Sequence, residues 1–404
     1  MAIREKIKQD FPIFGQIKDL VYLDNAATSQ KPAVVLQAVQ DFYTQSNANV
    51  HRGVYSLAEK ADRIFEEARE SCARLVNAEV SEIVFVKNAT EAANLVAYGY
   101  EKFIQPGDNV VVTELEHHSN YLPWWQVCQR RGAEFRVVRI EEQSGNLDLR
   151  QMAELVDEKT RIVAVTQMSN VLGNRTDLDR VIEIAHGVGA KVVVDAAQGI
   201  SHLGFDVKKT EADFVLVTGH KLLAPMGSGF LYAKKDCLEK MEVFMTGGGM
   251  VLEIEGRNGP TWMDYPAKFE AGTPDVAALA GLSAAIKYLE MIGFNNILEN
   301  DKKLVKLTRE KLAGCSRIKL LGTDDEEDWS SIVSFTIEGA HPHDIASILA
   351  ADKICIRAGH HCAKPIMKAL GEKATNRVSF HLYNDENDVL KLVESIEKVL
   401  KIFV

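Results

Sequence analysis

Several side chains with the chemistry of catalytic groups follow directly after short runs of β-branched residues. In an open parallel sheet, ligands bind outside the carboxyl ends of the strands, so we expect these side chains to meet at one edge. Together they supply an acid, a primary amine, an imidazole, a hydroxyl and two amides. They are Asp195 and Gln198 in KVVVDAAQ, Lys221 in VLVTGHK, His117 in VVVTELEH, Thr90 in VFVKNAT and Asn170 in VAVTQMSN.

This set is what pyridoxal 5'-phosphate requires. A lysine forms a Schiff base with the cofactor, an acid pairs with the pyridine nitrogen, a helix N-terminus holds the phosphate, and a flat ring such as His117 covers the cofactor ring. Each residue alone has an ordinary interpretation, because Lys221 resembles a surface lysine, and Asp195 and Thr90 resemble helix caps. Their joint placement at strand ends favours a cofactor site.

One of the six cysteines stands in a different context from the others. Cys362 follows Gly359-His360-His361 in an expected loop, where imidazoles and Arg357 favour its thiolate. We interpret the others as structural thiols. They are Cys72, Cys128, Cys237, Cys315 and Cys355.

A metal site is the alternative for this segment, because it is rich in thiols and imidazoles. No spacing matches a standard structural zinc pattern, so no metal is expected. The residues concerned are Cys355, His360, His361 and Cys362, with His341 and His343.

Composition limits the class of protein. The chain has 404 residues, 47 basic and 57 acidic, for a net charge of −10, which argues against nucleic acid or an anionic membrane as partner. No apolar run reaches the length of a spanning helix, and the N-terminus lacks the apolar stretch of a signal peptide. With no Cys-x-x-Cys pair and no disulfide framework, we expect a soluble, cytoplasmic protein with reduced thiols.

The elements that must position these residues alternate between strands and helices. Runs such as VVV, without polar alternation, are typical of strands buried on both faces, and predict a doubly wound, mostly parallel α/β sheet. A capping box at Ser56 and Glu59 predicts the start of a helix that runs toward Val76. The expected strands are 82–86, 109–113, 135–140, 161–166, 191–195, 213–217 and 229–233.

After about Gly272 the order of expected strands and helices changes, which predicts a second, smaller α+β domain. Its expected helices are 276–291, 295–312 and 344–352 with a closing helix, and its expected strands are 332–337, 354–357 and 377–381. The acidic run 324–328 and the basic helix face 302–311 are interpreted as solvated. We expect a large cofactor-binding domain over 18–288 and a small domain formed by 1–17 and 289–404, which carries Cys362.

Ordered motifs along nearly the whole chain resemble a known family. They are YLDNAAT (22–28), NVHRGVYSL (49–57), NATEAANLVA (88–97), ELEHHSN (114–120), SNVLG (169–173), VDAAQ (194–198), TGHK (218–221), FEAGTPD (269–275) and RAGHHCA (357–363). The chain resembles the SUF-type cysteine desulfurases (group II, NifS/CsdB-like) of the class V aminotransferases, a group that includes selenocysteine lyases. The resemblance implies fold type I of the pyridoxal-phosphate-dependent transferases. It also implies sulfur removal from L-cysteine to give L-alanine and a persulfide on Cys362, which supplies iron–sulfur cluster assembly.

The resemblance also implies a role for each site residue. Lys221, His117 and Cys362 are the expected catalytic residues. Thr90, His117, Asp195, Gln198, Thr218, His220 and Lys221 are expected to hold the cofactor, with Thr273 contributed by the other subunit of a homodimer. Asn170, Arg377, His51 and Arg357 are the expected substrate-binding residues. Two positions depart from the family, because Thr218 replaces a common Ser and Ala89 a common second Thr.

The prediction about the sulfur acceptor is based on the segment His341-Pro342-His343-Asp344. Pro342 and Asp344 are ordinary helix-start residues, and the histidines alone can be surface residues. Within the family this form resembles enzymes that pass sulfur to a zinc-binding SufU-type acceptor, whereas relatives that use a SufE-type acceptor tend to have an aromatic residue at His343. His343 is therefore the expected partner-docking residue.

Other functions stay open. The same cofactor and residues suit a selenocysteine lyase or an aminotransferase-like activity. A different class of function is a non-catalytic sulfur carrier or zinc-binding module with a vestigial pocket. The joint presence of Lys221, Asp195 and Cys362 argues against that class.

Overall fold

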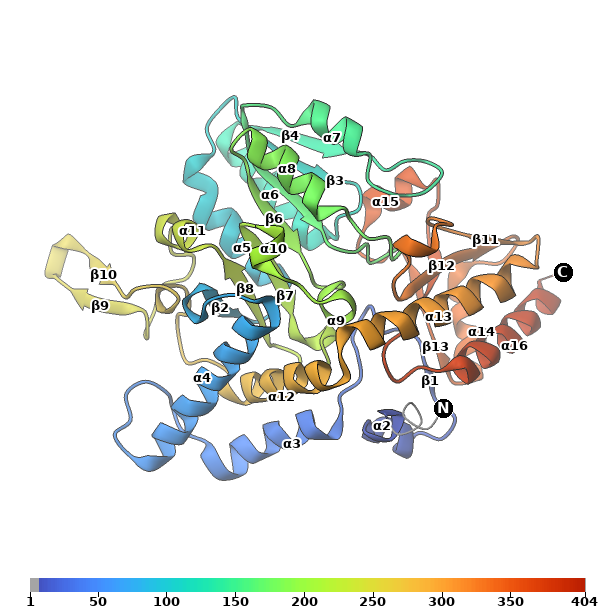
Figure 1. Cartoon of the computed structure of the whole chain (residues 1–404), viewed down its shortest axis with the longest axis horizontal. Coiled ribbons are helices and arrows are strands. Elements are labelled where there is room, and N and C mark those ends of the chain that lie inside the picture. The colour runs from blue at the N-terminus through green and yellow to red at the C-terminus, as the bar shows by residue number, and fades with distance from the viewer. Residues whose placement is uncertain (1–6, 404) are drawn as a thin grey trace.

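The computed structural model describes residues 7–403, and a seven-stranded sheet forms its centre (Figure 1). The strand order is β2-β8-β7-β6-β5-β3-β4, and all pairs are parallel except those of β8. This confirms the predicted mostly parallel α/β sheet. The strands are β2 (Ile83–Val86), β3 (Asn109–Thr113), β4 (Glu134–Val138), β5 (Thr160–Thr166), β6 (Lys191–Asp195), β7 (Phe214–Thr218) and β8 (Gly229–Ala233).

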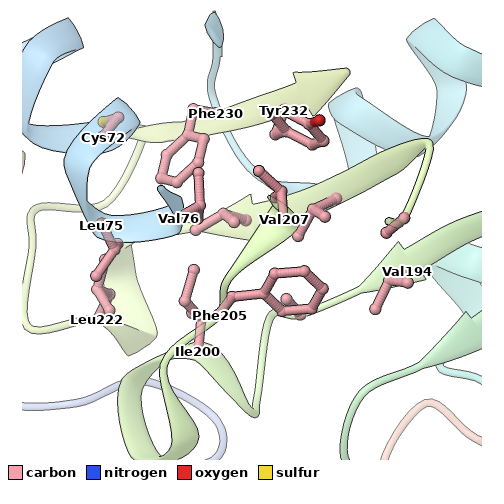
Figure 2. Close-up of a cluster of buried hydrophobic side chains, with 14 of the residues drawn as sticks. Cys72, Leu75, Val76, Val194, Ile200, Phe205, Val207, Leu222, Phe230 and Tyr232 are labelled. Atoms are coloured by element: carbon pink, nitrogen blue, oxygen red, sulfur yellow. The ribbon is translucent and has the colours of Figure 1, made fainter. Parts of the chain in front are cut away.

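Both faces of this sheet are buried, as the apolar runs predict. In β6, Val192 and Val194 join one apolar cluster while Val193 joins the other. The first cluster includes side chains of α4 (Ser56–Val76), α8 (Leu178–Gly187) and α12 (Val276–Ile292), and the second includes α5 (Ala89–Tyr100), α6 (His118–Arg131) and α11 (Lys235–Lys240). Figure 2 shows part of the first cluster, where Val194 of the sheet lies near Phe205 and Val207.

A second, antiparallel sheet of four strands, ordered β11-β12-β15-β14, lies to one side of the first (Figure 1). A third apolar cluster joins it to the helices α13, α14 and α16. The early strand β1 pairs with β13, so the segment around residues 21–22 lies against the C-terminal part of the chain. The domain boundaries at 18 and 288 stay a prediction. These elements are β1 (Val21–Tyr22), α13 (Phe294–Ala313), β11 (Ile318–Leu320), β12 (Ile332–Ile337), α14 (Pro342–Ala351), β13 (Ile354–Cys355), β14 (Arg357–Gly359), β15 (Thr375–Ser379) and α16 (Glu386–Ile402).

The predicted capping box is wrong. Tyr55 is the N-cap of α4, with extended φ and ψ of −124° and 153°, and no side chain caps it. Ser56 is therefore already helical, so its hydroxyl does not cap the helix. Glu59 still lies in the first turn, where its negative charge interacts favourably with the helix dipole and stabilises the helix.

Two other expectations differ in detail. The strand expected at 354–357 is two strands, because β13 pairs with β1 while β14 pairs with β15. The acidic run 324–328 includes a short 3-10 helix, Glu326–Asp328. Glu326 and Glu327 of this helix pair with Lys306 and Lys302 of α13.

The remaining elements connect and cover these layers, and a hairpin of β9 and β10 projects from the body (Figure 1). They are α2 (Pro12–Gln16), α3 (Ala33–Asp41), α7 (Leu149–Leu155), α9 (Ile200–Leu203), α10 (Val207–Thr210), β9 (Val251–Ile254), β10 (Pro260–Trp262) and α15 (Lys364–Ala369), with short helical turns at 42–46, 80–82, 101–103, 219–221, 256–258 and 267–269. Within residues 7–403, no single helix is long and apolar enough to cross a bilayer. By length and composition alone the pair α12 and α13 passes, bent by 76°.

Candidate active site

Lys221 lies on a single 3-10 turn, Gly219–Lys221, that follows β7 directly. Gly219 makes the turn possible, because a Cβ there would lie 2.3 Å from Ser228 Oγ. The main-chain oxygen of His220 accepts hydrogen bonds from Ser29 N at 3.1 Å and from Lys31 Nζ at 2.9 Å, which fixes the turn. Burial lowers the pKa of Lys221 to about 8, so its amine becomes neutral far more easily than that of an exposed lysine.

Asp195 ends β6, the strand next to β7, and is buried. Its Oδ1 accepts a hydrogen bond of 2.9 Å from Ala197 N. Burial raises the pKa of this carboxyl, while that hydrogen bond and the positive charge of Lys221 oppose the rise. The acid and the amine therefore interact across neighbouring strand ends, as the sequence predicts.

His117 is the N-cap of α6, and its Nδ1 accepts a hydrogen bond of 3.1 Å from Ser119 N. That bond leaves Nε2 as the protonated nitrogen of the neutral ring. Burial, with the charges of Lys221, His118 and Arg377, lowers the pKa of His117 to about 3. This lowered pKa favours the neutral form of the ring. Ser119 Oγ also lies 2.7 Å from Thr90 Oγ1, so the starts of α5 and α6 are joined.

Three of the residues expected at the phosphate, Thr90, Thr218 and His220, lie at the same edge and fit an anion. Thr90 is exposed in the first turn of α5, where helix N–H groups attract negative charge. Thr218 ends β7 and is buried, and its Oγ1 has no hydrogen-bond partner among the described residues. Because buried hydroxyls are normally hydrogen-bonded, this unpaired hydroxyl indicates a place where a ligand binds. The imidazole of His220, whose pKa burial lowers to about 4, belongs to the same turn as Lys221.

Gln198 is buried close to Asp195 in sequence, and its Nε2 donates to the main-chain oxygen of Ala26 at 2.8 Å. The amide nitrogen has two N–H groups, so the second remains able to donate to the cofactor's phenolate oxygen, as expected. That role stays a prediction.

Cys362 reaches this edge on the loop after β14. Cys362 O accepts a hydrogen bond of 2.8 Å from His118 N at the start of α6, and His361 O accepts one of 2.7 Å from Asn170 Nδ2. His361 and Cys362 both have φ of 53°, a left-handed conformation that turns the loop sharply. Cys362 is the exposed cysteine of the described chain, whereas Cys72, Cys128 and Cys237 are buried and Cys315 and Cys355 half-buried.

A group that suits a carboxylate lies beside this loop. Arg377 is 2% exposed, and its Nη1 donates to the main-chain oxygen of Asn170 at 2.7 Å. Arg377 Nε and Asn170 Oδ1 are buried without a partner within residues 7–403. The exposed Arg357 makes a two-pronged ion pair with Asp24 instead, with Nη2 at 2.7 Å from Oδ2. Asp24 and Arg357 therefore form a pair at the rim.

Three predicted residues lie apart from Lys221 in the single chain. His51 lines one pocket with Gly272 and Pro274, and Thr273 is exposed in the adjoining pocket. His343 is exposed in the first turn of α14, where its ring stacks on that of His341 at 5.5 Å between ring centres.

Sequence reasoning missed two acids and a lysine near this edge. Asp24 lies within YLDNAAT, so the motif could have identified it. Glu116 is fully buried, and burial raises its pKa to about 8 although Asn120 and Thr113 hydrogen-bond to it. Burial lowers the pKa of Lys31 to about 8. For the zinc alternative, no group of three His, Cys, Asp or Glu side chains in the described part of the chain could hold a metal ion.

Comparison with known proteins places this geometry in a family. The aminotransferase class-V model matches residues 21–392. A probable cysteine desulfurase of Streptomyces coelicolor is 41% identical over 99% of this chain and 97% of its own. The apo structure of a Thermococcus onnurineus cysteine desulfurase superposes with a TM-score of 0.94. A crystal structure of the Escherichia coli cysteine desulfurase CsdA superposes with a TM-score of 0.93. Each is 38% identical, and the match covers 99% of this chain and 99% of theirs. With its amine, acid and imidazole at the strand ends, the chain belongs to the class V aminotransferase family.

Proposed function

We propose that this protein is a pyridoxal-phosphate-dependent cysteine desulfurase, which removes sulfur from L-cysteine and leaves L-alanine. The observation that carries the proposal is the loop that brings the exposed Cys362 to the strand edge bearing Lys221. Cys362 O accepts a hydrogen bond of 2.8 Å from His118 N, and His118 follows His117 at this edge, so the loop is joined to the site. Cysteine desulfurases that match over almost the full length of this chain support the same activity.

Each side chain has a role in this reaction. When bound, pyridoxal phosphate supplies the electron sink that stabilises negative charge at the substrate Cα. Asp195 is the acid that pairs with the ring nitrogen, and Lys221 first holds the cofactor and then, as a free amine, takes the Cα proton. His117 stays neutral, so it covers the ring without adding a second positive charge near Lys221.

Sulfur transfer falls to Cys362. Its thiolate attacks the sulfur of the substrate and forms an S–S bond. The bond between the substrate's Cβ and sulfur breaks, and its electron pair stays on the three-carbon fragment. The fragment gains a proton at Cβ, regains a proton at Cα and leaves as alanine. A soft sulfur nucleophile suits a sulfur electrophile. The product on the protein is a persulfide.

Mass spectrometry after incubation with L-cysteine tests the proposal. We expect one added sulfur atom on the peptide that contains Cys362, together with one alanine for each sulfur. L-Selenocysteine under the same conditions tests the alternative of a selenocysteine lyase, and turnover of selenocysteine alone would favour it. Alanine release without any sulfur adduct would overturn the role of Cys362.

The proposal extends to a homodimer. His51 and Thr273 lie away from Lys221 in the single chain and border two adjoining pockets. Their family roles in binding substrate and phosphate therefore require a second subunit, and closed two-fold dimers are the commonest oligomers. Light scattering of the active enzyme should give twice the mass of 44.8 kDa.

A zinc-binding acceptor of the SufU type is the proposed recipient of the sulfur, for iron–sulfur cluster assembly in the cytoplasm. His343 is exposed at the start of α14, and an imidazole there can replace a thiolate on the partner's zinc. His343→Ala should abolish stimulation by a zinc-loaded acceptor and keep basal turnover, whereas the neighbouring Asp344→Asn should keep both. Unchanged stimulation of His343→Ala would contradict this docking role.

A further inference from the structure

We propose that Glu116 is a positioning residue for the cofactor ring: its buried carboxylate bridges the ends of β3 and β5 and so fixes His117 relative to Asp195. The proposed function assigns the cover of the ring to His117 and the partner of its nitrogen to Asp195, and Glu116 acts through these two residues. The inference rests on the cofactor of the proposed function and not on its substrate.

Glu116 follows β3 at the point where the order of the strands reverses. β3 lies between β4 and β5, so the chain continues from β3 to one side and from β5 to the other, through β6 and β7. Ligands of open α/β sheets bind at such a point. The pairing of β3 with β5 ends at Val111 and Val163, before the carboxyl ends of both strands. The two ends therefore need another connection.

The fully buried side chain of Glu116 supplies this connection. Its Oε1 accepts hydrogen bonds from Thr166 N of β5 at 2.9 Å and from Thr113 Oγ1 of β3 at 2.7 Å. Its Oε2 accepts a third from Asn120 Nδ2 of α6 at 2.6 Å. One carboxylate thus joins two strand ends and the start of a helix, and we call this arrangement the carboxylate bridge.

The bridge requires an acceptor at both oxygens of Glu116. Trp124 Nε1 donates to Asn120 Oδ1 at 3.3 Å, and an indole can only donate, so the Nδ2 of Asn120 faces Glu116. The main-chain N–H of Thr166 also can only donate. Burial raises the pKa of Glu116, and the three hydrogen bonds oppose that rise. An amide in place of the carboxylate would set one N–H group against another.

Both ends of the bridge lie next to the groups that hold the ring. His117 is the N-cap of α6, between Glu116 and Asn120 in the chain, so the bridge holds this N-cap from both sides. On the other side, Thr166 is the register partner of Asp195 in the pair of β5 and β6. A change at Glu116 therefore moves His117 relative to Asp195. Groups that bind a ligand keep their geometry only when neighbouring side chains support them.

Exchange of the two bridge side chains gives a sharp test. Glu116→Gln keeps the size of the side chain but sets its amide against that of Asn120. Asn120→Asp sets two carboxylates against each other. The Glu116→Gln/Asn120→Asp double variant again places one amide opposite one carboxylate and keeps the net charge, and its new carboxylate can still accept from Trp124.

The opposite ends of the same two strands offer a matched control. Asp157 Oδ1 accepts a hydrogen bond of 2.9 Å from Asn109 Nδ2 of β3, and Asn109 Oδ1 accepts one of 2.8 Å from Thr160 Oγ1 of β5. This carboxylate–amide pair joins the amino ends of β3 and β5, away from the strand ends that carry the site. Asp157→Asn therefore disturbs the same strands without disturbing the carboxylate bridge.

Three measurements on the full chain separate positioning from stability. They are the dissociation constant of pyridoxal phosphate, the circular dichroism of the bound cofactor at saturation, and the free energy of unfolding in denaturant. Pyridoxal phosphate is achiral, so its circular dichroism arises from the protein groups placed around its ring. A loss of stability alone does not change this signal in chains that are still folded.

We expect Glu116→Gln and Asn120→Asp each to weaken cofactor binding about tenfold and to lower the circular dichroism of the bound cofactor. The double variant should restore the dichroism and return to within about threefold of the wild-type affinity. Asp157→Asn should lower stability and leave both cofactor measurements unchanged. Unchanged cofactor measurements in Glu116→Gln, or a double variant no better than Asn120→Asp, overturn the inference.

The test remains decisive if Glu116→Gln does not fold, because Asn120→Asp and the double variant then give the comparison. Failure of the proposed function is read separately, from the wild type. Wild-type protein that binds pyridoxal phosphate but releases no alanine from L-cysteine would reject the function, while the cofactor measurements still decide the role of Glu116. Normal alanine release by the wild type with unchanged cofactor measurements in the variants would reject the role of Glu116 alone.

Discussion

Burial tunes the titratable residues of this site toward their neutral forms. Burial lowers the pKa of both Lys221 and His117. Neighbouring positive charges lower the pKa of His117 further, whereas at Lys221 the charge of Asp195 opposes the lowering. A neutral amine is a nucleophile and a base, and a neutral imidazole can lie against a cofactor without repelling Lys221. The site is thus prepared for chemistry by desolvation.

The first prediction concerns the pH at which Lys221 attaches the cofactor. Only the neutral amine attacks an aldehyde, so a lowered pKa moves attachment to lower pH. In cofactor-free protein, the rate constant for binding pyridoxal phosphate should rise with pH, reach half its maximum near pH 8 and level off above it. Stopped-flow absorbance between pH 6 and 10 measures this. A rate constant that is still rising at pH 10 would mean that the pKa of Lys221 is that of an ordinary, exposed lysine.

The second prediction separates cofactor binding from sulfur transfer. Cys362→Ser should keep the absorbance of the bound cofactor and lower cysteine turnover at least about 100-fold, because the attacking nucleophile is lost. Cys355→Ser is the control, since this half-buried thiol lies on β13 before the active-site loop. Alanine formation and the sulfur adduct are the two measurements. Full activity with sulfide release in Cys362→Ser would remove this residue from the mechanism.

At the scale of elements, one buried ion pair joins three segments near the proposed subunit boundary. Arg69 of α4 pairs with both oxygens of Glu270, at 2.7 and 2.8 Å, and also donates to Ile83 O. Glu270 Oε1 in turn accepts from Phe85 N of β2 at 2.7 Å. Glu270 lies within FEAGTPD, so this pair fixes the segment that presents Thr273.

Glu270→Gln tests that connection and is the third prediction. It leaves the nearly buried Arg69 without its counter-charge, so we expect a loss of about 3 kcal/mol in the free energy of unfolding. Glu290→Gln breaks the exposed pair with Arg74 of the same helix and should cost less than about 1 kcal/mol. Denaturant unfolding measures both. Equal small losses would show that the pair does not stabilise this junction.

At the scale of the whole molecule, the separation of Lys221 from Thr273 leads to the fourth prediction. If each site combines Lys221 of one subunit with Thr273 of the other, mixed dimers of Lys221→Ala and Thr273→Ala chains contain one intact site. Unfolding and refolding the two inactive variants together should restore about a quarter of wild-type activity, because about half of random dimers are mixed and each has one site. No recovery in the mixture would mean that the site does not combine the two residues across the dimer.

Much of the fold followed from local patterns. The bounds of β3, β6, β8 and β12 agree with the expected strands. The valine runs of β3 and β6 are a strong local signal for buried strands, and β8 and β12 are also short, mostly apolar runs. Asp195, Lys221 and His117 met at one edge as expected, since the carboxyl ends of parallel strands lie together. The start of α4 was misjudged, because the residue that caps a helix is decided by backbone torsion angles that Ser56 does not reveal.

By itself, the sequence determined the kind of sheet, the strand ends that carry the site and the family whose motifs it shares. Only the tertiary structure decided which distant residues interact. The sharing of Asp24 between Arg357 and Arg377 depends on β14 and β15 lying side by side, and the lowered pKa values depend on burial. Both arise from contacts between segments far apart in the chain, and a local pattern of residues holds no information about such contacts or about the water they exclude.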